Sequence, residues 1–289
     1  MSTLFRLNCN GVYIHHMRDE SPRVEDFPMH AHTTHELYYF IAGKGSYSVE
    51  ASTYHLYPGC VMVMRAGETH HLQIDPTSPY ERVTINFQPG LFQPIDPENR
   101  LTAAFVERPS GQRNLYEPDM LNTDLIHACL NTLALQGRAA SEEQKRLLTI
   151  SRLCPVLFEI YQCFSAEINR PLPRQSGPED IAGQLVQYIN SHLCEDLSLD
   201  ALAEHFFTSK IHLNNQFKQV TGSTIWEYTI IKRLLLAREY TQAGMPAGEA
   251  AEACGWKDYS SFYRSYKTRF HVSPAADYPR KKQKRAGKM

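Results

Sequence analysis

Two stretches near the carboxyl end repeat a pattern of side chains suited to contacting DNA. They are HLNNQFKQVTGST (residues 212–224) and FYRSYKTRFHVSP (residues 262–274). Each places an apolar or aromatic residue, then an aromatic residue four positions later, then a lysine. At helical spacing these residues give each stretch one apolar face and one polar face. Asn pairs well with adenine and Arg with guanine in the major groove, and Lys neutralises phosphates, so the repeat predicts two DNA-reading helices.

A short helix is predicted before each of these two helices, which gives two helix-turn-helix units. In the first unit Ser198 caps the short helix, and the small residue Ala203 lets the next helix cross it closely. In the second, Pro246 occupies a first-turn position, the chain turns at Gly255 and the next helix restarts at Asp258. The residues expected to face inward are Leu199, Leu202, Ala203, Leu213, Phe217, Ala250, Ala253, Phe262, Tyr266 and Phe270.

A long helix is predicted between the two units, in residues 223–244. It starts with a capping box in which Thr224 pairs with Glu227. This arrangement resembles the DNA-binding domain of the AraC/XylS family of transcription regulators, and the resemblance spans about Asp180 to Tyr278. The motifs that carry it are LSLDALA, the stretch from Ser209 to Lys218, the stretch from Arg233 to Ala237, and AAEACGWKDYSSFYRSYKTRFHVSP.

The sequence departs from the family pattern at two places. Asn215 stands where many relatives carry Arg, and Ala275 to Tyr278 replace the commoner ending. The resemblance implies binding to double-stranded DNA, contact with RNA polymerase, activation of transcription and a homodimer. Another possible function is that of an adaptor whose helical domain binds other proteins. Failure to bind duplex DNA in any sequence context would favour this function.

The predicted outer faces of the two DNA-reading helices carry the candidate contact residues. They are Lys210, Ile211, Asn214, Asn215 and Lys218 in the first unit, and Tyr259, Ser260, Ser261, Tyr263, Arg264 and Lys267 in the second. Arg264 is the expected guanine reader, and the two lysines are expected near backbone phosphates. The alternative is that the lysines are solvated charges and that the tyrosines pack.

The amino-terminal part is predicted to be all β at its core. From about Val12 to Phe92, short β-rich runs alternate with Gly and Pro, which indicates antiparallel strands in a sandwich or small barrel. HAHTTHELYYFIAG has the spacing HxHx3Ex6G and resembles the first signature of the cupin barrels. GCVMVMRAGETH resembles the second signature, with Arg65 in place of the usual Pro and Ile74 in place of Asn.

The cupin resemblance implies a metal site, because cupin enzymes bind a divalent metal through such residues. The ligands would be His30, His32, Glu36 and His70, a set suited to borderline ions. We favour a sensor without a metal cofactor, and a cupin-type metal-dependent enzyme is the alternative function. The residues expected to line an effector pocket, for a sugar or a carboxylate, are His30, His32, Glu36, Tyr38, Arg65, His70 and Arg82.

The expected fold is therefore a multidomain chain of α and β structure. A cupin-like or jelly-roll-like β-barrel with trailing helices is followed by an all-α domain with two helix-turn-helix units joined by a long helix. The boundaries we expect are a barrel at 1–118, a helical segment at 119–168 that is a candidate for dimerisation, a linker at 169–178, the DNA-binding domain at 179–280, and a basic tail at 281–289. The helical segment has an apolar stripe that either packs on the barrel or pairs with a second copy.

Composition is that of an ordinary globular protein, with 42% hydrophobic and 21% charged residues. From Pro178 onward there are 15 Lys and Arg against 12 Asp and Glu, although the whole chain has a net charge of −1. The seven cysteines contain no CxxC pair, which fits a reducing cytoplasm. We expect neither a signal peptide nor a membrane-spanning segment.

Overall fold

The computed structural model describes residues 2–138, 140–170 and 181–279. The chain divides into two compact units, of residues 1–184 with 215–223 and of residues 185–214 with 224–289. Only the first two residues of the predicted linker are among those described, and the predicted basic tail lies wholly outside them. The domain boundaries given above therefore stay a prediction.

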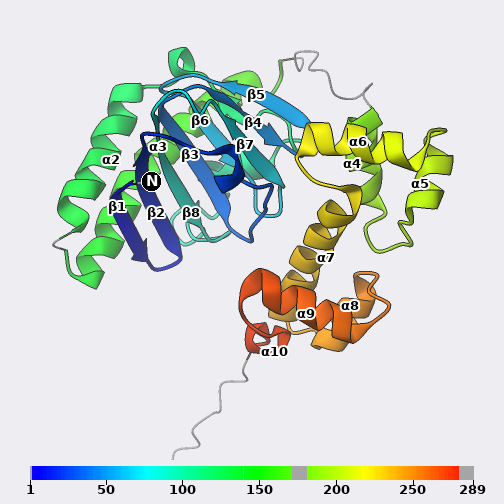
Figure 1. Ribbon diagram of the computed structural model, residues 1–289. Coiled ribbons are helices and arrows are strands. Elements are labelled where there is room, and N and C mark those ends of the chain that lie inside the picture. The colour runs from blue at the N-terminus through cyan, green and yellow to red at the C-terminus, as the bar shows by residue number, and fades with distance from the viewer. Residues whose placement is uncertain (1, 139, 171–180, 280–289) are drawn as a thin grey trace, which may run out of the picture. The chain divides into compact units, whose positions relative to one another are not determined.

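The amino-terminal part contains two antiparallel β-sheets (Figure 1). A six-stranded sheet has the order β1-β2-β8-β3-β6-β9, and a three-stranded sheet has the order β5-β4-β7. The strands are β1 (Ser2–Cys9), β2 (Val12–Asp19), β3 (His35–Ala42), β4 (Gly45–Val49), β5 (Ser52–Leu56), β6 (Val61–Met64), β7 (His70–Ile74), β8 (Tyr80–Phe87) and β9 (Leu115–Tyr116). The predicted β-rich core is confirmed, and β1 adds a strand before the first predicted run.

Strand alternation gives the larger sheet two different faces. On β8, Val83, Ile85 and Phe87 point to one face and join a large apolar core, whereas Arg82, Thr84 and Asn86 point to the other. A second apolar core lies on this other side and includes residues of both sheets, among them Tyr38, Tyr47 and Leu72. Polar residues on that face are therefore placed beside a core and not in open solvent.

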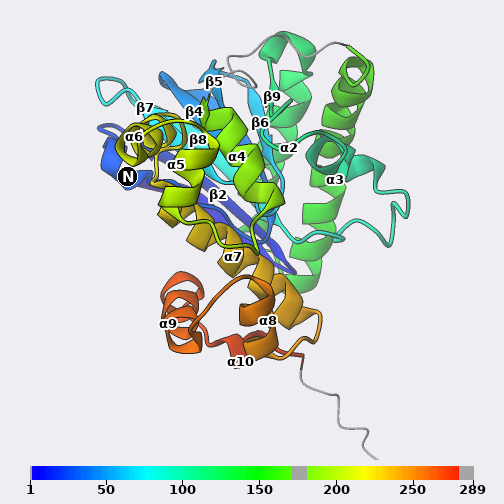
Figure 2. The ribbon, with the colours of Figure 1, turned by 90° about the vertical axis from the view of Figure 1, so that its right-hand side faces the viewer.

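Two helices cover the first face of the larger sheet (Figures 1 and 2). They are α2 (Thr123–Gly137) and α3 (Glu142–Glu167), after the short α1 (Ala103–Val106) and the 3-10 turns η1 (Val24–Asp26), η2 (Arg100–Thr102) and η3 (Pro118–Met120). Leu133, Val156 and Ile160 are fully buried in the same core as the strands. The apolar stripe thus packs on the sheet, although Leu135 and Leu147 remain exposed.

Among the described helices, α3 has the length and composition of a helix able to cross a membrane, which the sequence was not expected to contain. The core helix of a globular protein passes the same test. Leu153, Leu157 and Phe164 of α3 are buried against the sheet, so its apolar face already has a partner within the fold.

The carboxyl-terminal part is entirely helical. Its helices are α4 (Ile181–Ser191), α5 (Leu199–His205), α6 (Lys210–Thr221), α7 (Ile225–Gln242), α8 (Ala247–Ala253), α9 (Tyr259–Phe270) and α10 (Pro274–Asp277). Helices α5 and α6 form the first short pair and α8 and α9 the second, with the 18-residue α7 between them. This is the predicted order of elements.

Side-chain caps are present at the starts of α5, α6, α7 and α9, whereas α8 has none, and Pro246 stands at its N-cap and not in its first turn as predicted. Ser198 accepts from the backbone N–H of Ala201, and the Thr224 and Glu227 capping box is present. Ser209 caps α6 by accepting from the N–H of His212, and the Asp258 carboxylate accepts from two N–H groups at the start of α9. Each cap satisfies backbone donors that have no partner inside the helix.

The observed burial differs from the prediction at several positions that were expected to face inward. Leu199 is 37% exposed, because it is the first residue of α5 and lies ahead of the turn that packs. In α8 the second inward residue is Ala251 and not Ala253, since a seven-residue helix places only one short stripe against α7. Phe262 and Tyr266 are fully buried, whereas Phe270 is only partly buried at the end of α9.

Arg233 on α7 holds the loop between α4 and α5 and the turn of the second helix-turn-helix unit. Its guanidinium donates to the carbonyls of Leu193 (2.8 Å) and Glu195 (2.6 Å), which follow α4, and to the carbonyl of Gly255 (3.0 Å) in the turn of the second unit. Gly255 has φ +78°, and an added Cβ there would lie 2.8 Å from the carbonyl oxygen of Cys194. Glycine is thus required at this turn.

Candidate effector pocket and nucleic-acid interface

A cavity of about 470 Å³ lies against the second face of the larger sheet. Its lining residues come from neighbouring strands β2, β8 and β3, from the segment before β3, and from the smaller sheet. They are Tyr13, His15, Phe27, His30, His32, Thr34, Glu36, Tyr38, Tyr47, Leu72, Tyr80, Arg82, Thr84 and Asn86. A concave site with an apolar wall and a few convergent polar groups is typical of small-molecule binding.

Strand register explains why these residues converge. Asn86 on β8 lies opposite Tyr13 on β2 and opposite Glu36 on β3, which makes one row across the sheet. Thr84 lies in the next row, between His15 and Tyr38. Because side chains alternate along a strand, residues two apart reach the same side. The alternation in YERVTINF was the signal that would have added Thr84 and Asn86 to the expected pocket.

Five of the seven predicted pocket residues line the cavity, and two do not. His70 is 1% exposed and lies behind the cavity wall, within 4.3 Å of the His30 ring, centroid to centroid. Arg65 was expected in the pocket and does not line this cavity. It follows the last residue of β6, and its guanidinium lies 3.7 Å from the Glu68 carboxylate, which is itself bound to Arg108.

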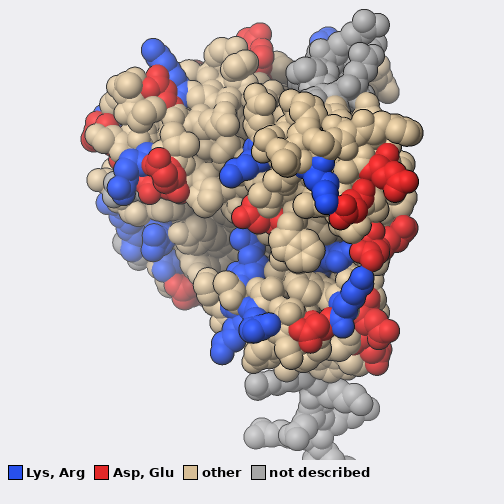
Figure 3. Space-filling model, turned by 45° about the vertical axis from the view of Figure 1, so that its right-hand side comes forward, with Lys and Arg blue, Asp and Glu red and all other residues tan. Residues whose placement is uncertain are grey.

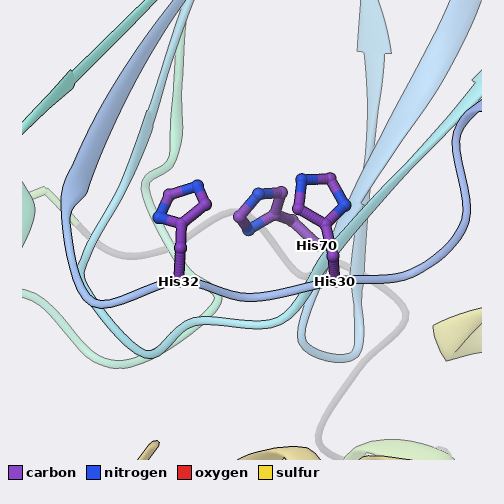
Figure 4. Close-up of side chains that lie close together, drawn as sticks. All are labelled: His30, His32 and His70. Atoms are coloured by element: carbon purple, nitrogen blue, oxygen red, sulfur yellow. The ribbon is translucent and has the colours of Figure 1, made fainter. Parts of the chain in front are cut away.

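Three histidines meet at one end of the cavity (Figure 4). His30 and His70 are held as a pair by two backbone hydrogen bonds, of 3.0 and 2.8 Å, and one ring nitrogen from each of His30, His32 and His70 lies within 4.8 Å of the others. The Nδ1 atoms of all three rings lie 2.9 to 3.0 Å from backbone carbonyl oxygens. A neutral His30 or His70 ring with this contact carries the proton on Nδ1, which leaves the lone pair on Nε2, whereas His32 donates from Nε2 to the Glu36 carboxylate.

Glu36 completes the cluster. Its Oε2 atom lies 2.8 Å from Nε2 of His32 and 4.0 Å from Nε2 of His70, and it accepts from Nδ2 of Asn86 at 2.9 Å. Burial raises the pKa of Glu36. The hydrogen bond from His32 and the electrostatic effect of the histidines together outweigh burial, so the net pKa falls below the usual range. Burial lowers the pKa of His70 well below its usual value. The cluster therefore presents an anionic carboxylate beside a neutral ring.

The donor set fits a divalent cation. His70 Nε2 is buried and has no hydrogen-bond partner. A buried polar atom without a partner is costly, and a cation would satisfy it. Three imidazoles and a carboxylate suit borderline ions such as Zn²⁺, and the contacts from Nδ1 to carbonyls are those that orient metal-binding histidines. A bound ion would supply a Lewis acid for oxygen atoms of an effector.

The outer face of α6 carries three of the expected DNA-contacting residues in the exposed position predicted for them. Ile211 is 75% exposed, and Asn215 and Lys218 are also exposed. Lys210 is exposed and forms a 2.7 Å ion pair with Asp200. Asn214 differs from expectation. It is only partly exposed, and its Oδ1 accepts from the backbone N–H of Ile225 at 3.1 Å, so it holds the start of α7 instead of facing outward.

Helix α9 presents most of its candidate residues to solvent. Tyr259, Ser260, Tyr263, Arg264 and Lys267 are exposed. Ser261 is only partly exposed; its N–H donates to Asp258, and its Oγ accepts from Arg264 at 3.4 Å. On the face drawn in Figure 3, basic and acidic side chains are interspersed.

A ligand-accepting β-domain joined in one chain to paired helix-turn-helix units defines a DNA-binding transcription regulator. The family model of the AraC-like ligand binding domain matches residues 18–153, and that of a helix-turn-helix domain matches residues 202–277. The transcriptional activator RhaS of Escherichia coli O1:K1 is 25% identical over 255 residues, which are 86% of this chain and 86% of that protein. The chain belongs to the AraC/XylS family of transcription regulators.

Comparison with solved structures also found two chains of low similarity. ToxT from Vibrio cholerae O395 is 10% identical, with a TM-score of 0.39, over 92% of this chain and 96% of that chain. The C-terminal domain of AraT from Geobacillus stearothermophilus is 25% identical, with a TM-score of 0.34, over 36% of this chain and 92% of that chain. The relatives found are transcription regulators and not enzymes, so the alternative of a cupin-type enzyme is set aside.

Proposed function

We propose that a small-molecule effector bound in the cavity of the β-domain changes how a homodimer of this chain presents its helix-turn-helix units to DNA. The chain acts in the cytoplasm, and with RNA polymerase it activates transcription. The observation that carries the proposal is the presence, in one chain, of a lined cavity and two recognition helices with outward polar side chains. The named activator among its relatives supports the direction of the effect.

In this proposal, α6 and α9 enter successive stretches of the major groove. A major groove about 12 Å wide admits one helix, and two helices on one spacer reach sites about one turn, or roughly 34 Å, apart. Asn215 and Arg264 read base edges, and Lys218 and Lys267 neutralise phosphates. Ile211 is placed for apolar contact with a thymine methyl group.

Selection of bound duplexes from a random pool by the full-length protein tests the proposal. We expect two short motifs about one helical turn apart, with binding that weakens as salt rises. Binding of an effector and of this operator must then affect each other by the same factor. If no motif is enriched at low salt, the protein does not read DNA sequence, and an adaptor role for the helical domain is favoured instead.

A further inference from the structure

Arg82 lines the effector cavity beside two neighbouring aromatic rings. Its guanidinium carbon is 5.6 Å from the centre of the Phe27 ring and 5.3 Å from that of Tyr80, and the two ring centres are 5.5 Å apart. The rings attract the cation without neutralising its charge. Its Nη1 atom is buried and has no hydrogen-bond partner. Among the residues that the structure describes, no carboxylate forms an ion pair with Arg82.

The charge on Arg82 persists despite its surroundings. Burial opposes it, but the phenol groups of Tyr80 and Tyr38 and other neighbours outweigh this and raise the pKa of the guanidinium. Glu36, a carboxylate that lines the same cavity, already accepts from Asn86 and is paired with His32. Arg82 is thus a partly buried cation with no ion-paired carboxylate among the described residues, and the anion of a ligand would compensate its charge.

We propose that Arg82 is the anion-binding residue of the cavity and that the effector is a small carboxylate. A carboxylate has two oxygens that match two N–H groups of a guanidinium, whereas the hydroxyl groups of a neutral sugar would leave the charge uncompensated. This inference rests on the proposed effector function and narrows its chemistry.

The rest of the cavity wall defines the body of this carboxylate. Phe27, Tyr47, Leu72 and Tyr80 are buried and line the cavity with apolar carbon, and Phe27 and Tyr80 lie next to Arg82. Burial raises the pKa of Tyr47 well above its ordinary value, so its hydroxyl stays protonated. The wall suits a carboxylate with an aliphatic or aromatic body better than a polyhydroxylated one.

Calorimetric titration of the full-length protein tests the inference. The probes are hexanoate, benzoate and phenylacetate, each paired with its amide, and a set of neutral monosaccharides. We expect at least one carboxylate to bind, its amide to bind at least about 10-fold more weakly, and Arg82→Gln to weaken the carboxylate by about 10- to 100-fold. Arg82→Lys keeps the positive charge but cannot donate two parallel N–H groups, so its affinity for the carboxylate should lie between those of the unaltered protein and Arg82→Gln. Arg65→Gln is the matched control and should leave binding unchanged.

Three results would overturn the inference: no carboxylate binds, an amide or a sugar binds as well as any carboxylate, or the carboxylate binds Arg82→Gln as tightly as the unaltered protein. In the last case, loss of binding in His70→Ala would assign the anion to the histidine cluster. If Arg82→Gln does not fold, the comparison of carboxylate with amide on the unaltered protein still decides. Operator selection by the same protein is read separately, so failure of DNA binding is distinguishable from failure of carboxylate binding.

Discussion

The two neighbouring asparagines of α6 should have separable effects when each is changed to alanine. Asn215 is exposed, and its replacement should leave the free energy of unfolding within about 0.5 kcal/mol of the original. If it pairs with a base, operator affinity should fall by about 1 to 3 kcal/mol, or roughly 5- to 150-fold. Asn214 accepts from the N–H of Ile225, which is one of the unpartnered donors at the start of α7. Its replacement should cost about 1 kcal/mol of stability.

Chemical denaturation and titration of a fluorescent operator duplex measure these two quantities on the same protein samples. The two variants control for each other, because residue type and helix are the same and only the side-chain environment differs. A selection experiment with Asn215→Ala should also lose its preference at one base position. The reasoning is refuted if Asn214→Ala leaves stability unchanged and abolishes the base preference, since Asn214 would then face DNA as the repeat first suggested.

Three further predictions concern two buried side chains that stabilise the fold, Glu68 and Arg233, and the histidine cluster. Glu68 is 2% exposed and bound to Arg108 at 2.8 Å; burial raises its pKa, but Arg108 and backbone donors lower it to about 2. In the unfolded chain the pKa of a glutamate carboxyl is about 4.3. The ionised Glu68 therefore contributes about 3 kcal/mol to the free energy of unfolding above about pH 4.3, and this contribution is lost as the pH falls toward about 2. Glu68→Gln should cost about 3 to 5 kcal/mol at neutral pH in a denaturation series, because Arg108 would stay buried without an anion; a flat acid profile would contradict this. Arg233→Lys should lower the free energy of unfolding by about 2 to 3 kcal/mol, because lysine cannot serve three separated carbonyls, and unchanged stability would show that the loops hold without it. After dialysis of the full-length protein against Zn²⁺ and then against metal-free buffer, elemental analysis should find about one equivalent of zinc per chain. His70→Ala should lose this zinc, and the neighbouring His71→Ala should keep it. Equal retention of zinc by both variants would place the ion elsewhere.

Elements with strong periodicity or explicit caps were predictable from the sequence. The helix starts at Ser198, Thr224 and Asp258 follow from local hydrogen bonding, which needs no tertiary information. Contacts between residues far apart were not predictable. Asp277 accepts from Tyr266 at 2.7 Å and from Arg238 at 3.0 Å, which ties the unusual ending to α7 and α9, and nothing in the spacing indicates this.

The candidate pocket shows the same division between local and tertiary information. Arg65 and Arg82 are residues of one type in one β-domain, and both were expected to face the ligand. Strand alternation fixes the direction of the Arg82 side chain. Arg82, Thr84 and Asn86 alternate along β8 with residues of the apolar core, so all three point to the opposite face, which carries the cavity. Arg65 lies just beyond the end of β6, where alternation no longer fixes its direction, and it turns to Glu68.

If the cavity binds the effector as proposed, β8 should contribute strongly to selectivity, because Arg82, Thr84 and Asn86 line the cavity. It pairs with β2 on one side and with β3 on the other, so its inward side chains reach the middle of the cavity floor. A change at Arg82 should alter which charge the cavity accepts, whereas a change at Asn86 should act through Glu36 and the histidines. Exchange of Arg82 alone should therefore change the class of effector that binds without changing zinc retention by the cluster of His30, His32, Glu36 and His70, and both properties can be measured on one variant.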